Sequence, residues 1–346
     1  MHSIVAHEKV KGNNKQAVLN AVKKAMRNAN WQKFVKGKKI FIKINMLSHQ
    51  VVPGLCTSPW VIEAVLQELK QLKARIVIGD ADVATVKQVE KAAKNWQILE
   101  LCKKYGAKFV NLSKCKTKIV PFQGKVFDKL YLPLPIAQAE SIITIPVLKT
   151  HSLSTMTCSL KNQWGCLPRY RQIYHDRLHQ AIAEMNCAIK VNFVITDATI
   201  CSEGNGPRNS TPKIVNSILA SNDRVANDAI CAEMIGVNHE SIEYIKIAEE
   251  LGIGTTKCKI IGEGIKNEHF LLPNLNKMFV IKWEMRLRHT PILRTLLFKT
   301  LLFTIFAWLA TKYNTFYWHQ TVGKKAAREF VKQNNIYSKE FIALVR

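Results

Sequence analysis

The chain has 346 residues, 47% of them hydrophobic, and Gly and Pro are not in excess at 15 and 11 residues. This composition supplies a sizeable core for one large or two medium domains and excludes a fibrous or disordered class. The formal charge of +26 favours an anionic partner: a small molecule, a lipid surface or a nucleic acid. A solvated Lys-rich surface is the alternative, because the lysines are scattered and form few blocks.

The nine cysteines are spread singly along the chain, and no two of them form a CxxC motif. This spacing argues against a zinc ribbon, an iron–sulfur cluster of the ferredoxin type and a secreted disulfide scaffold. The N-terminus carries charge before any apolar run and does not resemble a signal peptide. We therefore expect a cytoplasmic protein, and leave open a peripheral position on the inner face of the cell membrane.

Residues 14–196 alternate between helical and extended hydrophobic patterns. In chain order the sequence predicts a helix at 14–28, a strand at 38–44, a helix at 59–72, a strand at 74–79, a helix at 86–104, and strands at 108–111, 141–147 and 191–196. Ser58 is suited to be the N-cap of the second helix, with Pro59 in its first turn. This alternation is typical of an α/β fold with a mostly parallel sheet and helices on both faces.

The C-terminal part differs in character from this region. We expect residues 1–265 to form the α/β region and residues 266–346 to form a basic, apolar helical extension. Within it, 293–310 is strongly apolar, but Arg294 and Lys299 interrupt it, so the run is too short for a membrane span. Flanking basic and aromatic residues suit a helix lying in an anionic membrane interface. A core or dimer helix is the alternative, which leaves a homo-oligomer open; a last amphipathic helix is predicted at 322–334.

Ligands of parallel sheets bind beyond the carboxyl ends of the strands, so polar residues that directly follow predicted strands are candidates for a site. These residues are Asn45, Asp80, Asp82, Lys149, His151 and Asp197.

The densest polar cluster runs from Lys149 and His151 to Lys161 and Asn162, from the end of one strand into a predicted helix. The two lysines are able to hold a phosphate or carboxylate, and the start of a helix offers free backbone N–H groups to an anion. His151 is a candidate proton carrier or metal ligand. For each lysine alone, a solvated surface position is the alternative.

Two further segments carry residues with catalytic or metal-binding chemistry. His175 and His179 are four residues apart, so on a helix they share a face and are able to chelate a divalent metal. Glu203 and Asn205 lie in a run, EGNGP, that predicts a turn or loop, with Glu203 as a general acid or base or as the partner of a lysine. The sequence contains no P-loop or GxGxxG motif, so no nucleotide is predicted.

A helix is also expected after residue 223, with Asp223 as its N-cap. Asp228 lies inside that helix among apolar neighbours and needs a partner if it is buried.

Several of these motifs together resemble the domain-of-unknown-function-362 family over residues 38–265. The motifs are Lys43-Ile44-Asn45, Thr57-Ser58-Pro59, Ile78-Gly79-Asp80, Lys149-Thr150-His151, Ser159-Leu160-Lys161-Asn162, Gly165, Glu203-Gly204-Asn205-Gly206-Pro207 and Asp228. Many members of that family carry ferredoxin-type cysteine motifs, which this sequence lacks.

The chain is more distantly similar to the catalytic domain of nickel-dependent lactate racemase. The resemblance implies two α/β lobes with a cleft between them, the second lobe at about 140–265. It also implies that His151, Lys161 and either His175 or His179 correspond to the residues that attach and ligate a nickel cofactor there. The Gly-rich context of the racemase lysine is absent here.

The favoured interpretation is an enzyme of isomerase/racemase-like or oxidoreductase-like type that binds an anionic small molecule. Its expected catalytic residues are His151, Lys161 and Glu203, with substrate held by Asn45, Lys149, Asn162, Asp197 and Asn205 and a metal by His175 and His179. The cofactor is not predicted; a divalent metal is left open and the isolated cysteines disfavour an iron–sulfur cluster. The alternatives are a redox or iron–sulfur accessory protein and a nucleic-acid-binding protein, which no nucleic-acid motif supports.

Overall fold

The structure is a computed structural model that describes residues 3–12, 14–83, 88–167, 171–274, 301–333 and 335–345, with a few residues between 286 and 296. Its strands are β1 (Ile4–Lys9), β2 (Lys39–Ile44), β3 (Arg75–Asp80), β4 (Lys108–Asn111), β5 (Thr117–Pro121), β6 (Lys129–Pro133), β7 (Ser141–Ile145), β8 (Val147–His151), β9 (Thr155–Thr157), β10 (Phe193–Asn205), β11 (Asn209–Ser221) and β12 (Lys259–Gly262).

Its α-helices are α1 (Lys15–Asn28), α2 (Trp31–Phe34), α3 (Pro59–Leu69), α4 (Val89–Asn95), α5 (Ile98–Tyr105), α6 (Leu134–Ala137), α7 (Ser159–Asn162), α8 (Leu178–Ala188), α9 (Arg224–Met234), α10 (Glu243–Glu250), α13 (Leu301–Lys312), α14 (Lys324–Lys332) and α15 (Ser338–Val345). Short 3₁₀ segments are η1 (Lys70–Leu72), η2 (Leu112–Lys114), η3 (Gln163–Cys166), η4 (Arg171–Arg177) and η5 (His239–Ser241), and η7 (Tyr313–Gly323) is a π-helical segment.

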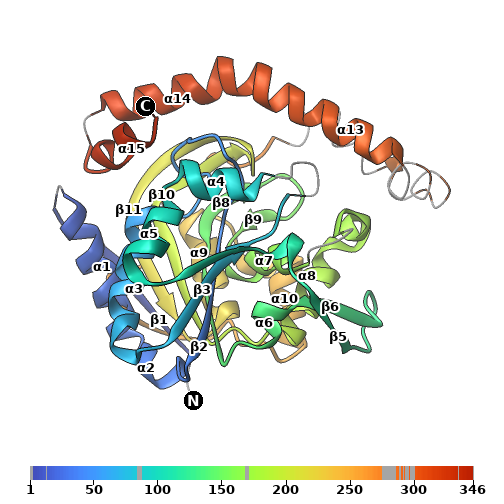
Figure 1. Cartoon of the computed structure of the whole chain (residues 1–346), viewed down its shortest axis with the longest axis horizontal. Helices are drawn as coiled ribbons and strands as arrows, with labels where there is room; N and C mark the ends of the chain where they lie inside the picture. The colour runs from blue at the N-terminus through green and yellow to red at the C-terminus, as the bar shows by residue number, and fades with distance from the viewer. Residues whose placement is uncertain are drawn as a thin grey trace.

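One mixed sheet of ten strands runs through the α/β region, in the order β12-β1-β11-β10-β7-β2-β3-β4, with β8 beside β10 and β9 beside β8 (Figure 1). The central pairs β10·β7, β7·β2, β2·β3 and β3·β4 are parallel. The pairs β1·β11, β10·β11 and β8·β9 are antiparallel. This is the expected α/β fold, with a largely parallel centre and an antiparallel hairpin added on one side.

Helices cover both faces of this sheet because its central strands are apolar on both sides. In β2, Ile40, Ile42 and Ile44 pack into the core under α1, α3 and α5, whereas Phe41 packs into a second core under α8, α9 and α10. The same alternation points the next side chain on the Phe41 side, Lys43, toward the second face. The polar site described below lies on that side.

Most predicted elements are found within two residues of their expected ends, including the Ser58 cap, whose hydroxyl accepts the Trp60 N–H at 3.2 Å. The helix predicted at 86–104 is wrong as a single element: α4 and α5 are separated at Gln97, which has a φ of +56°. The strand predicted to end at residue 196 continues to Asn205, and β11 pairs with it throughout. The first three residues of the EGNGP run, Glu203–Asn205, therefore belong to a hairpin strand, and the predicted turn begins at Gly206.

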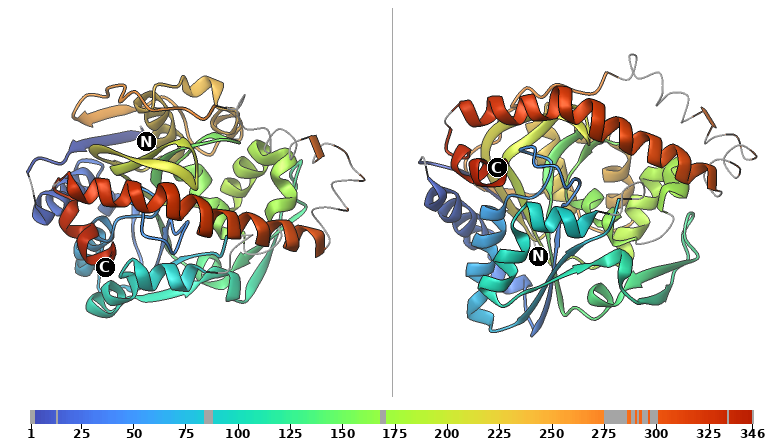
Figure 2. Two further views of the ribbon diagram at one scale, coloured as in Figure 1. Left: turned by 90° about the horizontal axis from the view of Figure 1, so that it is seen from above. Right: turned by 45° about the horizontal axis from the view of Figure 1, so that its top comes forward.

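Three helical segments, α13, η7 and α14, form a long helical run across one end of the molecule (Figures 1 and 2). Asn314 in this run donates to Asn209 Oδ1 at 2.9 Å, at the start of β11. The predicted helix at 322–334 matches α14. Of the predicted apolar run 293–310, residues 301–310 lie in α13. Among the described residues, no helix has the length and apolarity to cross a bilayer.

Candidate functional site

A cavity of about 280 Å³ lies at the carboxyl ends of β2, β3 and β8, where a ligand site of a parallel sheet is expected. Its wall combines residues from separate parts of the chain, including one from the C-terminal run, Phe303. The lining includes Lys43, Asn45, Asp80, Lys149, His151, Thr157, Lys161, Asn162, Trp164, Gly165, Arg171, Gln172, His175 and Pro207.

The charges of this wall are strongly unbalanced. Its described lining residues carry four basic side chains that are ordinarily cations, from Lys43, Lys149, Lys161 and Arg171, and one carboxylate, from Asp80. Only Lys43 has a carboxylate partner, because its Nζ lies 2.7 Å from Asp80 Oδ1. A cavity of this kind attracts an anion, since burial costs each unpaired cation its hydration.

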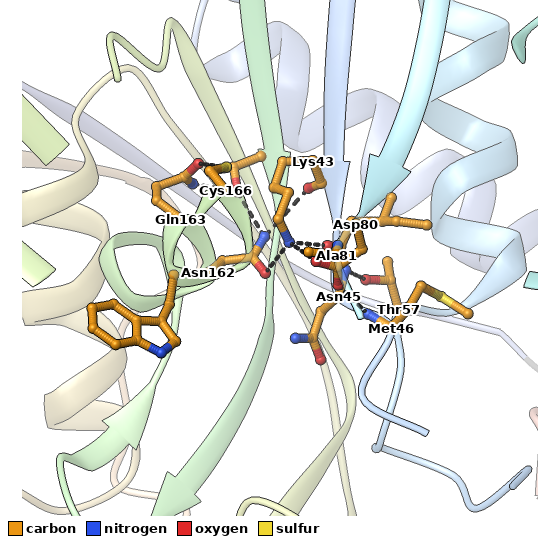
Figure 3. Close-up of polar contacts among 12 residues, drawn as sticks. Lys43, Asn45, Met46, Thr57, Asp80, Ala81, Asn162, Gln163 and Cys166 are labelled. Carbon is orange, nitrogen blue, oxygen red and sulfur yellow. Dashed lines mark hydrogen bonds and ion pairs between the residues drawn. The ribbon is translucent and has the colours of Figure 1, made fainter. Parts of the chain in front are cut away.

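Lys43 and Asp80 form a buried pair supported by hydrogen bonds on all sides (Figure 3). Lys43 Nζ also donates to the Ile44 carbonyl at 2.6 Å and to Asn162 Oδ1 at 3.3 Å. The Asp80 carboxylate accepts the backbone N–H groups of Met46 and Ala81 at 2.8 and 2.7 Å. The pair thus fixes the ends of β2 and β3 relative to Asn162 and forms the floor of the cavity.

Lys149 lies in β8 and is held by two acceptors. Its Nζ donates to Asn45 Oδ1 and to the Leu55 carbonyl, both at 2.5 Å. Burial lowers the pKa of Lys149 to about 8. The predicted position of this residue beyond the strand is wrong, because Pro146 is followed by β8 and the Lys149–His151 motif is itself extended.

Lys161 is the least compensated charge of the site. It lies in α7, whose first backbone N–H groups, those of Ser159 and Leu160, donate to the Asp228 carboxylate at 2.8 and 3.0 Å. No hydrogen bond or ion pair of the Lys161 ammonium is found within the described ranges, and its side chain is buried. Burial, and then the nearby charge of Arg171, lower the pKa of Lys161 to about 7.

His151 ends β8 with a defined tautomer. The Leu153 N–H donates to His151 Nδ1 at 3.0 Å, so the proton of the neutral ring lies on Nε2. Burial first, and then the charges of Lys161 and other cavity residues, hold the pKa of His151 well below its ordinary value. Near neutral pH the ring is therefore an uncharged donor and not an imidazolium.

Two more donors of the wall have incomplete or neutral partners. The Arg171 guanidinium is buried and donates to two backbone carbonyls, those of Trp164 and Asp82, at 3.2 and 2.7 Å. The Thr157 hydroxyl is buried and has no hydrogen-bond partner among the residues with described positions. Both groups therefore remain available to an anion.

The structure brings many of the predicted site residues to this one cavity and leaves others outside it. Inside are Asn45, Lys149, His151, Lys161, Asn162 and His175. The EGNGP run lies beside the Lys149–His151 motif, since the Thr150 hydroxyl donates to the Gly204 carbonyl at 2.8 Å, and Pro207 reaches the cavity wall.

Asp197, Glu203 and Asn205 do not line the cavity. Asp197 is buried and accepts the Ser58 N–H at 2.8 Å, so it supports the start of α3. Glu203 lies 3.4 Å from Lys213 Nζ and accepts the Leu271 N–H at 2.9 Å, on the outer part of the hairpin. Asn205 accepts the Asn274 N–H at 3.4 Å.

His175 and His179 lie in different elements, η4 and the first turn of α8. The His175 ring packs edge-on against Trp164 at 5.6 Å, whereas His179 stacks with Tyr244 at 6.0 Å, and only His175 lines the cavity. Over the described residues, no group of three or more His, Cys, Asp or Glu side chains is arranged to hold a metal ion.

Lys43 and Arg171 are absent from the candidate residues of the sequence, and Asp80 is a candidate only by its position after a strand, with no role assigned to it. A signal for Lys43 and Asp80 exists in the sequence, since they lie near the ends of neighbouring parallel strands, where Lys43 is in register with Gly79. No comparable signal exists for Arg171, which lies in a short 3₁₀ segment.

The chain matches a family model and is similar to known proteins. The family described as a domain of unknown function (DUF362) matches residues 40–233. Thylakoid-associated protein sll1697 of Synechocystis sp. is 26% identical over 269 residues, which cover 73% of this chain and 78% of that protein.

Among solved structures, the lactate racemase apoprotein from Thermoanaerobacterium thermosaccharolyticum is similar with a TM-score of 0.42 and 13% identity. The match covers 68% of this chain and 57% of the racemase chain. This likeness is remote.

Proposed function

We propose that the cavity of this chain, which belongs to the DUF362 family, is the active site of an enzyme. The enzyme binds a small anionic molecule and catalyses a proton transfer to or from that molecule. The observation that carries the proposal is the buried side chain of Lys161, whose ammonium has no counter-ion among the described residues. A group with a pKa near 7 is suited to both accept and donate a proton at physiological pH.

Each group of the wall has a role in this proposal. Arg171, Lys149 and the Thr157 hydroxyl hold the anionic group of the substrate, because they are donors with incomplete or neutral partners. Lys161 carries the proton. Neutral His151 donates a hydrogen bond from Nε2 to a second substrate oxygen and does not itself change charge, because its pKa is too low.

Proton transfer at a carbon next to a carboxylate or phosphate-bearing group fits this arrangement best. The anion holders place the substrate, the amine of Lys161 removes a proton, and the remaining donors stabilise the charge that develops on the substrate oxygen. A reaction of this kind agrees with the isomerase/racemase-like enzyme that we expect from the sequence. A protein that only binds the anion is the competing explanation.

The test is exchange of substrate protons for deuterium. A set of small hydroxy, oxo and phospho acids is incubated with the protein in D₂O, and loss of the carbon-bound proton signal is followed by NMR. Exchange of one class of acid is expected, with K161M inactive and K103M, at an exposed lysine, fully active. Binding of an acid without exchange would leave a binding protein and overturn the enzymatic role. Binding of the acid that is unchanged in R171M, which removes an anion-holding side chain, would overturn the site.

A peripheral membrane location is part of the same proposal. The name of the Synechocystis relative, a thylakoid-associated protein, supports a membrane link for this chain, on the cytoplasmic face in our proposal. Cell fractionation tests it: the chain is expected in the membrane pellet and is expected to be released by detergent.

A further inference from the structure

The C-terminal helical run has one side on the body of the protein and one side in solvent. On the inner side Phe303 lines the cavity, Trp318 is buried and Asn314 bonds to the β10–β11 hairpin. The outer side carries large apolar side chains that are each 50–64% exposed. We name these the outer apolar face: Ile305, Trp308, Leu309, Phe316 and Tyr317.

This arrangement follows from helical spacing. Ile305, Trp308, Leu309 and Lys312 are three or four residues apart and share the side of α13 opposite to Phe303. Exposed apolar groups on this scale mark a surface that binds a partner or a membrane when the protein functions. Because Phe303, Asn314 and α14 contact the body at separate points along the run, the face is held in place and does not need to form on binding.

The charges of the run identify the partner. Residues 301–333 contain five basic side chains, Lys312, Lys324, Lys325, Arg328 and Lys332, and one acidic side chain, Glu329. Lys312 Nζ lies 5.3 Å from the centre of the Trp308 ring and 4.9 Å from that of Phe316, so a cation lies within the apolar face itself. This mixture of aromatics and lysine side chains is that of a helix in the interface of an anionic membrane.

We infer that the outer apolar face docks on an anionic lipid bilayer, with the basic side chains of α14 toward its headgroups. A second copy of the chain is disfavoured as the partner, because a symmetric contact would bring the same five basic side chains together. Phe303 lies on the opposite side of the same helix, so docking places the cavity directly beneath the bilayer surface, separated from it by α13.

The experiment is sedimentation of the full chain with vesicles of pure phosphatidylcholine or of phosphatidylcholine and phosphatidylglycerol in equal amounts. The chain is expected to bind the anionic vesicles at least tenfold more tightly, and to lose most of that preference at high salt. The double variant W308S/F316S is expected to bind at least tenfold more weakly, as is K324E/K325E. The matched control Y131S, at an exposed tyrosine of β6 (44% exposed), is expected to bind like the unchanged protein.

Three results overturn the inference. Equal binding to both vesicle types removes the role of lipid charge. Binding of W308S/F316S at the level of the unchanged protein removes the face. A dimer in light scattering that W308S/F316S dissociates, without vesicle binding, shows that a second copy covers the face instead. Circular dichroism confirms that each variant is folded. K161M is expected to bind vesicles normally, so failure of the proposed reaction and failure of docking are told apart.

Discussion

Lys43 Nζ lies 2.7 Å from Asp80 Oδ1, and this is the one ion pair that the described wall of the cavity contains. Both side chains are almost completely buried. Because Asp80 is occupied by Lys43 and by two backbone N–H groups, it is not free to neutralise Lys149, Lys161 or Arg171. The pairing of one lysine thus leaves the other cations for a ligand.

Replacing Asp80 by Ala is expected to destabilise the fold by about 3–5 kcal/mol, since the Lys43 charge stays buried without a counter-ion. Chemical denaturation measures the effect. The matched control is E90A, which removes the exposed pair Lys114–Glu90 (2.6 Å) and is expected to cost less than about 1 kcal/mol. Similar losses for both variants would contradict the assigned role of the Lys43–Asp80 pair.

The depressed pKa of Lys161 has a defined effect on stability. A lysine whose pKa is about 7 in the folded state and 10.5 when exposed binds fewer protons folded than unfolded between these values. The stability that depends on an uncharged Lys161 side chain is therefore fully present above pH 10.5 and is lost as the pH falls to 7. The free energy of unfolding is expected to gain about 1.4 kcal/mol per pH unit from this group between pH 7.5 and 9.5.

K161M removes this titrating amine. The variant is therefore expected to show a flatter profile of stability against pH and a higher stability at pH 7. The control K103M, at an exposed lysine, is expected to keep the profile of the unchanged protein. Denaturation curves at closely spaced pH values measure both. An identical slope for K161M and the unchanged protein would show that Lys161 is solvated or paired.

Gly165 is expected to be intolerant of any side chain. A Cβ at this position would lie 2.3 Å from Asp80 Oδ1 and 2.8 Å from Lys43 Nζ. G165A must therefore displace the buried pair and is expected to cost about 1–3 kcal/mol, as overpacking does, and to weaken ligand binding. Thermal unfolding with and without ligand measures both effects. The control G264A meets no atom within 4 Å, and a comparable loss there would contradict the steric explanation.

The sequence predicts the local part of this architecture well. Strands of apolar residues and helices with capped starts produce the same pattern in any context, and Ser58, Asp223 and the strands at 38–44 and 74–79 are found as expected. The rule that ligands bind beyond parallel strands also predicts the end of the sheet at which Asn45 and His151 meet.

The sequence does not predict the direction in which individual side chains point. Glu203 belongs to a motif next to the cavity, but strand pairing to Asn205 turns it toward Lys213. The role of His151 also changes, because burial among cations lowers its pKa while its neighbour Lys161 takes a value near 7. Both effects depend on neighbours that are remote in the chain.

The contact of Glu340 with Ser58 is of this long-range kind and fixes the C-terminus to the body. Glu340 Oε1 accepts the Ser58 hydroxyl at 2.6 Å and the Trp60 N–H at 3.2 Å, and both residues lie at the start of α3. Nearby, the Phe341 ring packs edge-on against Trp96 at 5.8 Å. E340A is expected to loosen α14 and α15, which hydrogen exchange of residues 324–345 detects as faster exchange.

Its pH dependence distinguishes this residue from an ordinary surface glutamate. Burial raises the pKa of Glu340 to about 8, so the folded state binds more protons than the unfolded state between pH 4.5 and 8. The attachment it provides is therefore complete below pH 4.5, weakens by about 1.4 kcal/mol per unit between pH 4.5 and 8, and is lost above pH 8. E340Q, which keeps an acceptor without a titrating group, is expected to hold the C-terminal helices equally at pH 6 and 9. The exposed control E329Q should follow the unchanged protein. Exchange is compared as protection relative to the intrinsic rate at each pH, and pH-independent protection in the unchanged protein would contradict a protonated Glu340.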